Sequence, residues 1–306
     1  MFRHILVPLD GSPLAERVLP YVQAIAAAGN ARLVLLRAVS PQGSHPDGNA
    51  TTDHPAALTE AESYLRDLAQ RLSPAATDWV VEEGEATDVL LGAITRRGID
   101  LVAMSTHGRS GIGRWIYGSV ADTILRHAPV AVLLASATMK MTRWRSDRPL
   151  RILVSLDCSA LSEAILEPAC ALADTLKAEL ILLSVAPLLV TPDPYGGIYL
   201  AYDPDQDRAE RRTYLEGIAA KLRAPGRNVA VRDAFGLVDT TLLDVAHEEG
   251  ADLIALATHG TSGVTRLLMG SVATSIVQRA PLPLLIVRPA DVREEPDLSK
   301  EGETTE

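Results

Sequence analysis

The sequence contains few cysteines and few aromatic residues. Its 306 residues include two cysteines, Cys158 and Cys170, and aromatic side chains make up 4% of the chain. Two cysteines do not make the disulfide framework of a small secreted protein. We therefore expect both to be ordinary small apolar residues, in a protein of the reducing cytoplasmic compartment.

The chain also lacks an excess of positive charge. It carries 29 basic and 39 acidic residues, a formal net charge of -10. Binding to nucleic acid or to an anionic membrane surface depends on clustered cations that release counterions. The charge balance therefore argues against both partners, and a phosphate ligand would have to be held by local donors.

Long apolar runs are missing as well. No run approaches the roughly 18 residues that read as a membrane-spanning helix, and "MFRHILVPLD" enters a strand pattern at once. We expect neither a signal peptide nor a membrane span. Apolar residues still make up 47% of the chain, enough for two soluble domains with cores of their own.

One design is written twice in the chain. "HILVPLDGSPLAERVL" from His4 matches "RILVSLDCSALSEAIL" from Arg151, and "HAPVAVLLA" from His127 matches "RAPLPLLIV" from Arg279. Such self-similarity predicts a tandem domain duplication. The expected parts are a first domain over 1–137, a linker over 138–149, a second domain over 150–290 and an acidic disordered tail over 291–306.

Short apolar runs alternate with stretches of helical spacing in each copy. This alternation predicts an α/β fold: two tandem five-stranded parallel-sheet sandwich domains of doubly wound type. Strands are expected over 4–9, 31–39, 78–83, 100–105 and 130–135, and over 150–156, 179–185, 228–233, 252–257 and 282–288. Helices of the first copy are expected over 13–28, 55–72, 87–97 and 115–127. The ranges 41–55 and 187–204, rich in Pro, Gly and Asp, are expected to be surface loops.

Glycine-rich loops follow the fourth strand of both copies: "STHGRSGIGRWIYGS" over 105–119 and "ATHGTSGVTRLLMGS" over 257–271. Open parallel sheets bind ligands beyond the carboxyl ends of their strands, where the strand order reverses. Glycine bares main-chain N–H groups, and the following helix start adds partial positive charge, so phosphate is the favoured ligand. The pairs Gly118–Ser119 and Gly270–Ser271 can each return one N–H and one hydroxyl to that ligand. A purely structural turn is the alternative.

Aspartates end the first strand of each copy, Asp10 in "ILVPLDGS" and Asp157 in "ILVSLDCS". A carboxylate there can accept hydrogen bonds from a ribose hydroxyl or an adenine amino group, although Asp-Gly-Ser is also an ordinary turn sequence. Since a carboxylate repels a triphosphate, Asp10 should face the nucleoside.

Dedicated catalytic machinery is not evident. Phosphoryl transfer needs a base, a metal clamp and cations on the transferred group, yet no P-loop lysine follows the glycines. Arg109, Arg114 and Arg266 are either solvated helix-start residues or phosphate ligands. His107 and His259 either order the loop by a hydrogen bond or contact phosphate. We therefore expect no catalytic and no metal-binding residue, although slow hydrolysis stays open.

These motifs resemble the universal stress protein family, in particular its tandem-domain members, over about residues 2 to 289. The resemblance implies the α/β sandwich of the adenine-nucleotide α-hydrolase-like group, a regulatory role in stress response, and ATP with Mg as ligand. The ATP-binding branch carries the motif G-x2-G-x9-G-[ST]. Carried over residue by residue, the first site comprises Pro8, Asp10, Gly11, Val39, Ser105, His107, Gly108, Arg109, Gly111, Gly118, Ser119 and Val120.

The second site departs further from the family pattern. Its members would be Asp157, Val185, Ala257, His259, Gly260, Gly263, Gly270, Ser271 and Val272. Ser105 and Ala257 stand where the motif has its first glycine, which adds a Cβ that could narrow the approach to the ligand. Ser155 and Cys158 replace Pro8 and Gly11. The resemblance implies that Val39 and Val185 lie beside the adenine.

Two other functions stay open. The chain could be a nucleotide-free dimerising scaffold of the same fold, or an enzyme that uses an adenine nucleotide, although "PLDGSPLAE" shows no signature for gripping pyrophosphate. In the family the fifth strands commonly pair two domains. We expect the two copies to pair in this way within one chain, which could then form a homodimer.

Overall fold

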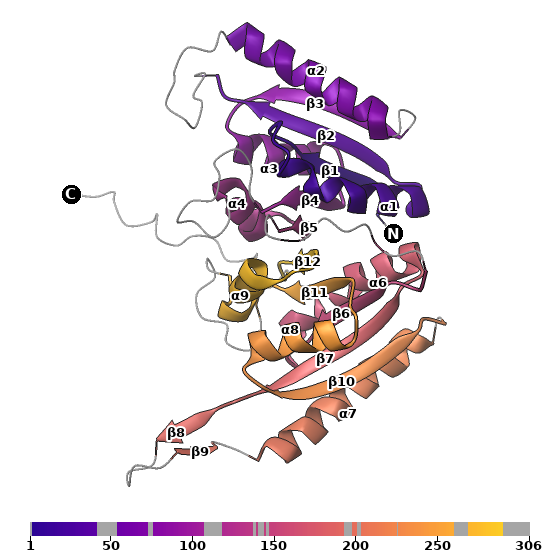
Figure 1. Ribbon diagram of the computed structural model, residues 1–306, viewed down its shortest axis with the longest axis vertical. Helices are drawn as coiled ribbons and strands as arrows, with labels where there is room; N and C mark the ends of the chain where they lie inside the picture. Colours follow the sequence, from indigo (N-terminus) through magenta and orange to yellow (C-terminus); the bar gives the residue numbers. More distant parts are fainter. Residues whose placement is uncertain are drawn as a thin grey trace, which may run out of the picture.

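The structure, a computed structural model, is built on one ten-stranded β-sheet with helices on both faces (Figure 1). It describes residues 2–41, 54–72, 76–106, 118–136, 139, 144, 147–192, 198–200, 203–224, 226–259 and 269–289. The strand order is β10-β7-β6-β11-β12-β5-β4-β1-β2-β3. The predicted tail over 291–306 and most of the predicted linker lie outside the described residues.

The first copy supplies one half of the sheet. Its elements are β1 (His4–Pro8), a 3-10 turn (Ala15–Val18), α1 (Leu19–Gly29), β2 (Arg32–Val39), α2 (His54–Leu72), β3 (Thr77–Glu83), α3 (Ala86–Arg96), β4 (Leu101–Ser105), α4 (Ser119–His127) and β5 (Ala131–Ala135). Strands β3, β2, β1, β4 and β5 pair in parallel, as the alternating pattern predicted.

The second copy repeats this plan with an addition. Its elements are β6 (Arg151–Ser155), α5 (Ala160–Glu163), α6 (Leu166–Leu176), β7 (Glu179–Pro187), β8 (Val190–Pro192), β9 (Ile198–Leu200), α7 (Pro204–Arg223), β10 (Val229–Gly236), α8 (Val238–Glu248), β11 (Leu253–Ala257), α9 (Ser271–Arg279) and β12 (Leu284–Val287). Strands β8 and β9 form a small antiparallel sheet. The range 187–204 is therefore not the irregular loop that its Pro and Gly content predicted.

Helices divide between the two faces of the sheet. Helices α1, α2, α6 and α7 bury one apolar core against it, and α3, α4, α8 and α9 bury the other. The inner strands β4 and β5 are buried along their whole length, which explains their continuous apolar sequence. None of the described helices combines the length and the apolar character that crossing a bilayer requires.

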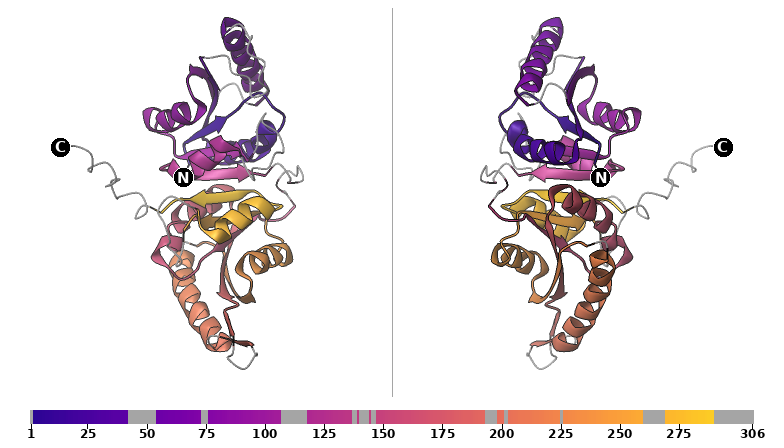
Figure 2. Two further views of the ribbon diagram at one scale, coloured as in Figure 1. Left: turned by 90° about the vertical axis from the view of Figure 1, so that its left-hand side faces the viewer. Right: turned by 90° about the vertical axis from the view of Figure 1, so that its right-hand side faces the viewer.

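The two halves meet at one antiparallel strand pair. Leu133 of β5 lies opposite Leu285 of β12, and both side chains are fully buried. Figure 2 shows the halves joined along this seam, and both cores contain residues of both copies. Strands β5 and β12 run in opposite directions, whereas β2 and β7 run the same way across Figure 1, because the sheet twists between them.

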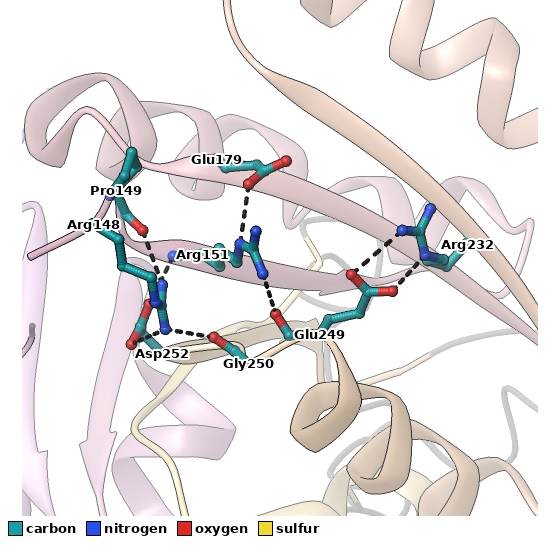
Figure 3. A network of polar contacts seen from close by, with 8 residues as sticks. All are labelled: Arg148, Pro149, Arg151, Glu179, Arg232, Glu249, Gly250 and Asp252. Atoms are coloured by element: carbon teal, nitrogen blue, oxygen red, sulfur yellow. Dashed lines mark hydrogen bonds and ion pairs between the residues drawn. The ribbon is translucent and has the colours of Figure 1, made fainter.

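A polar network holds the amino edge of the second half (Figure 3). Asp252, just before β11, accepts hydrogen bonds from the Arg148 guanidinium at 2.8 and 3.1 Å and from the Arg151 N–H at 2.9 Å. Arg151 also reaches Glu179 at the start of β7. The network fixes the start of β6 at the amino edge of the sheet.

Leu285→Ala tests whether the seam makes the two halves one cooperative unit. Emptying this buried site should cost about 2–5 kcal/mol of unfolding free energy. Trp79 and Trp115 lie in the first copy, whereas Trp144 donates to the Asp252 carbonyl of the second copy, so the fluorescence of a Trp144→Phe background reports the first copy. We expect the urea midpoint measured by fluorescence to fall although the substitution lies in the second copy. An unchanged fluorescence midpoint beside a lowered circular-dichroism midpoint would mean that the halves unfold separately.

Candidate functional site

The strand order reverses at one place in each half of the sheet. Strand β1 lies between β2 and β4, and β6 lies between β7 and β11, with the connections leaving in opposite directions. The crevice at the carboxyl ends of such a strand pair is where open α/β sheets bind ligands. Asp10 and the start of α4 flank the first crevice, and Asp157 and the start of α9 flank the second.

A backbone hydrogen bond joins the two ends of each glycine loop, and we call this closure the neck. The Gly118 N–H donates to the Thr106 carbonyl at 2.8 Å, and the Gly270 N–H donates to the Thr258 carbonyl at 2.8 Å. The threonine N–H groups donate to Ala135 and Val287 at the ends of β5 and β12. Sequence reasoning missed both threonines, although the repeated "THG" triplet carried the signal.

The interior of both loops lies outside the described residues. This applies to His107, Gly108, Arg109, Gly111 and Arg114 in the first copy, and to Gly260, Gly263 and Arg266 in the second. What the structure places is the neck, the strand ends and the helix starts.

The neck shows how the backbone of Gly118 and Gly270 is used. Each Gly-Ser pair was predicted to return one N–H and one hydroxyl to the ligand, and the glycine N–H of each pair is engaged by a threonine carbonyl. Neither glycine has positive φ, with values of -62° and -56°. Glycine serves close approach here, since an added Cβ would lie 3.6 Å from the Thr106 oxygen and 3.1 Å from the Thr258 oxygen.

Among the described residues, the further N–H groups that could serve a ligand at this edge belong to the first turn of the helix. Ser119 and Val120 are the first two residues of α4, where N–H groups have no acceptor within the helix. Ser119 is exposed, and Val120 is half-buried against the core under α4. Ser271 and Val272 repeat this arrangement in α9.

Asp10 and Asp157 each close a tight turn directly after the first strand of their copy. Asp10 Oδ1 accepts the Ser12 N–H at 2.9 Å, and Asp157 Oδ1 accepts the Ser159 N–H at 3.1 Å. Between them stands a residue with positive φ, Gly11 at 84° and Cys158 at 68°. A side chain in that conformation costs about 1–2 kcal/mol, so the second turn is strained where the first is not. Burial of the thiol is the largest influence on Cys158, and it raises the pKa of this group.

Ser105 and Ala257 stand where the motif has its first glycine, and their side chains point away from the helix whose start would hold phosphate. Ser105 is buried, and its hydroxyl donates to the Ala135 carbonyl at 3.1 Å. Side chains alternate along a strand, and Ala103, two residues earlier, belongs to the core under α1. Ala257 packs against the same core, whereas α4 and α9 cover the other face. These Cβ atoms were expected to narrow the approach to the ligand. They lie on the face of the sheet opposite α4 and α9.

The sheet register corrects one pair of predicted residues. Pro8, the half-buried last residue of β1, lies opposite Leu36, and Ser155 lies opposite Leu183. Counting on from these partners, Val39 corresponds to Ala186, and Val185 corresponds to Ala38. Because side chains alternate, Val39 and Val185 point to opposite faces of the sheet. They cannot play the same part beside a ligand.

A polar cluster beside the strand-end aspartates escaped sequence reasoning. The Tyr64 hydroxyl donates to Glu16 at 2.9 Å, and the Tyr214 hydroxyl donates to Glu163 at 3.0 Å. Burial, the hydrogen bond to Glu16 and the charges of Glu16 and Asp10 raise the pKa of Tyr64 well above its ordinary value. The two tyrosines are equivalent, and each stays a neutral donor at physiological pH.

An arginine completes this cluster from a different element in each copy. In the first, Arg37 of β2 is 7% exposed, its guanidinium carbon lies 5.7 Å from the centre of the Tyr64 ring, and one nitrogen contacts Glu60. In the described part of the chain, no acceptor lies within reach of Arg37 Nη1.

In the second copy Ser184 stands at the position of Arg37, and a guanidinium reaches it from α7. Arg211 donates to the Ser184 hydroxyl at 3.1 Å and pairs with Asp207 at 2.7 Å. A guanidinium therefore lies beside this position in both copies, although no single sequence position carries it.

His259, the last described residue before the second loop, has its Nδ1 2.8 Å from the Thr258 hydroxyl. This contact joins two neighbouring residues just before the loop, and the choice between loop ordering and phosphate contact stays a prediction for both histidines. Within the described residues, no group of three His, Cys, Asp or Glu side chains is arranged to hold a metal ion.

The fold is that of an α/β protein in which each half of the sheet carries the same strand-order reversal, strand-end aspartate and helix start. The model of the universal stress protein family matches residues 1–136 and again 150–288. The chain therefore belongs to the universal stress protein family and carries two copies of its domain.

Relatives and solved structures agree with this assignment. The chain is similar to a universal stress protein of Mycolicibacterium smegmatis, at 24% identity over 93% of this chain and 97% of the relative. One copy is 30% identical to universal stress protein YxiE of Bacillus subtilis, over 45% of this chain and 98% of the relative. The fold resembles the crystal structure of a universal stress protein from Archaeoglobus fulgidus, with a TM-score of 0.68 and 22% identity over 93% of this chain and 98% of that one.

Substituting the two neck glycines tests the close approach. Alanine readily adopts the φ angles of Gly118 and Gly270. The distance from the added Cβ to the threonine oxygen therefore decides how much stability each substitution loses. Gly118→Ala should stay within about 0.5 kcal/mol of the unfolding free energy of the wild type. Gly270→Ala should lose about 1 kcal/mol, because its Cβ meets an unyielding backbone oxygen. Urea unfolding measures both, and equal losses would contradict the proposed role of the contact.

Proposed function

We propose that the chain binds ATP in both crevices and acts as a nucleotide-dependent regulator in the stress response of its cell. One observation carries the proposal: in both copies a helix whose first N–H groups have no acceptor within the helix, and a strand-end carboxylate, lie at the carboxyl ends of the strands where the strand order reverses. Phosphate suits the first feature and a nucleoside suits the second.

The described residues fit a nucleotide with its phosphates at α4 and its nucleoside at β1. The Ser119 and Val120 N–H groups and the Ser119 hydroxyl would donate to phosphate oxygens, supported by the partial positive charge of the helix start. Asp10 would accept from a ribose hydroxyl or the adenine amino group. Mg would neutralise phosphate charge and would arrive with the nucleotide.

The first site should bind more tightly than the second. Its turn is built on Gly11, whereas Cys158 adds a strained side chain at the same place. Arg37 also keeps a buried guanidinium nitrogen without an acceptor in the described residues, while Arg211 uses donors on Ser184 and Asp207. A ligand acceptor beside Arg37 would remove the cost of leaving this donor unpaired.

We propose a binding protein rather than an enzyme. The described donors are main-chain N–H groups and a hydroxyl, which hold phosphate without activating water. The competing scaffold function is favoured by the engagement of the Gly118 and Gly270 N–H groups within the protein, which leaves the loop neck closed by its own hydrogen bond.

Two substitutions of Ser119 separate its hydroxyl from its N–H. Ser119→Ala removes the hydroxyl alone. Ser119→Pro removes the N–H as well, and proline fits the first helical position after Gly118, whose ψ is 151°. For wild type, Mg-ATP at one hundred times its Kd should stabilise the fold by about 2.7 kcal/mol. We expect Ser119→Ala to reduce this stabilisation and Ser119→Pro to reduce it further, as measured by thermal unfolding and calorimetric titration.

Ser271→Ala and Ser271→Pro form the matched pair for the second site. Their smaller effect on total binding would reflect the weaker second crevice. Full ATP-dependent stabilisation in a chain carrying both proline substitutions would show that the helix starts do not hold the phosphates. A wild type with no response at millimolar Mg-ATP would favour the scaffold.

A further inference from the structure

One buried arginine carries a donor that the described part of the protein does not use. Arg37 of β2 is 7% exposed, and its Nη1 has no acceptor among the described residues. Its Nη2 lies 3.3 Å from a Glu60 oxygen, and the Glu60 side chain is 62% exposed. Burying a guanidinium nitrogen without an acceptor destabilises the folded chain. The packing of the protein gives no reason for this donor, whereas a bound ligand would.

The fold itself does not require an arginine at this place. Leu33 and Leu35, earlier on β2, belong to the core under α2, and the alternation of side chains along the strand places Arg37 on the same face. The matching residue of the second copy is Ser184, which is fully buried. A short hydroxyl side chain is therefore enough to complete this face of the sheet, and Arg37 adds a charge that the fold does not need.

Arg37 stands at the carboxyl edge of the sheet, one strand away from Asp10. The Leu9 N–H donates to the Leu36 carbonyl at 2.8 Å, and the parallel register places Arg37 opposite Leu9, the residue before Asp10. Neighbouring strands lie about 4.8 Å apart. A ligand that reaches Asp10 therefore needs to extend by only one further strand to meet Arg37.

The strand order gives a nucleotide this direction. Strand β4 lies on one side of β1, and β2 lies on the other (Figure 1). The proposed function puts the phosphates at the start of α4, which follows β4, and the nucleoside at Asp10, which follows β1. Because the line from β4 through β1 leads to β2, the base is the part of the nucleotide that would arrive at Arg37.

The Arg37–Glu60 pair suits one edge of an adenine. Arg37 Nη1 offers an N–H donor, and the neighbouring Glu60 carboxylate has about four acceptor sites. Adenine carries an acceptor ring nitrogen beside its donor amino group. The ring nitrogen would satisfy the buried donor, and the amino group would donate to Glu60. Phosphate oxygens suit this place less well, because the carboxylates of Glu60 and Asp10 would repel them.

We propose that Arg37 recognises the base in the first crevice: its Nη1 donates to a ring nitrogen of the adenine of bound ATP. This inference rests on the proposed function, and it names a residue outside the positions that the family resemblance implied. In the second copy the guanidinium beside the matching position belongs to Arg211, which donates to Ser184 and pairs with Asp207. Base recognition by an arginine is therefore confined to the first crevice.

A cycle of substitutions in the protein and in the ligand tests this contact. Arg37→Met removes the donor and fills its place with apolar atoms, and 1-deaza-ATP and 7-deaza-ATP each replace one ring nitrogen of adenine by a CH group. Losing a hydrogen bond to a charged group should weaken binding about tenfold or more. We expect this loss for Arg37→Met with ATP, and for the wild type with one of the two analogues. Arg37→Met should lose nothing further with that analogue.

Calorimetric titration measures these affinities in a chain that also carries Ser271→Pro, so that the first crevice dominates the signal. Arg211→Met is the matched control, because it removes a guanidinium from the equivalent place in the second copy. It should leave the affinity for ATP and the preference over the analogues unchanged.

The melting temperature of the free protein separates base recognition from packing. Arg37→Met should melt at or above the temperature of the wild type, because it removes a buried donor that has no acceptor. A packing role would give the opposite result, a lower melting temperature with an unchanged preference for ATP over the analogues. Arg37→Gln, whose amide is shorter, provides a second measurement of the cycle if Arg37→Met folds poorly.

Two results would overturn the inference while ATP binding itself persists. They are equal affinity of the wild type for ATP and both analogues, and an Arg37→Met protein that still discriminates against the analogue as the wild type does. A wild type that binds no ATP would instead remove the proposed function, and this inference with it. The two failures are therefore distinguishable.

Discussion

The hydrogen bond between a glycine N–H and a threonine carbonyl governs the geometry of both crevices. At 2.8 Å in each copy, it returns the chain to the carboxyl end of the fourth strand after the glycine loop. The following helix must then begin beside the strand-end aspartate, with its first N–H groups directed over the edge of the sheet. Without this closure, neither helix start would have a defined place relative to Asp10 or Asp157.

The antiparallel seam gives the duplicated site its arrangement. Strands β5 and β12 pair antiparallel, and each half of the twisted sheet carries one of the two strand-order reversals. The copies have diverged around this shared frame: the strained Cys158 turn replaces a glycine turn, and a helix arginine replaces a strand arginine.

Much of the fold was predictable because duplication and hydrophobic alternation are strong signals. All ten strands of the large sheet, and their parallel pairing in each half, follow from short apolar runs separated by helical spacing. The β8–β9 arm was not predictable, because its Pro and Gly content is typical of loops and its pairing depends on a hairpin that projects from the sheet.

The site was predictable only in outline. The aspartates, the glycine loops and the helix starts could be located, but hydrogen-bond partners could not, so the bond from the Gly118 N–H to the Thr106 carbonyl was not foreseen. The family resemblance gave Val39 and Val185 the same position beside the adenine, but the strand register places their side chains on opposite faces of the sheet. The arginine of the polar cluster was invisible, because Arg37 and Arg211 occupy unrelated sequence positions and meet only in space.

Amide hydrogen exchange, resolved by residue, tests the central claim most directly. In the free protein the Gly118 and Gly270 amides should exchange slowly, since the threonine carbonyls engage them, while the amides of Ser119, Val120, Ser271 and Val272 should exchange fast. Mg-ATP should slow the second group and leave the glycines as they were. Fast exchange at the two glycines, or helix-start amides that ATP leaves untouched, would contradict the account.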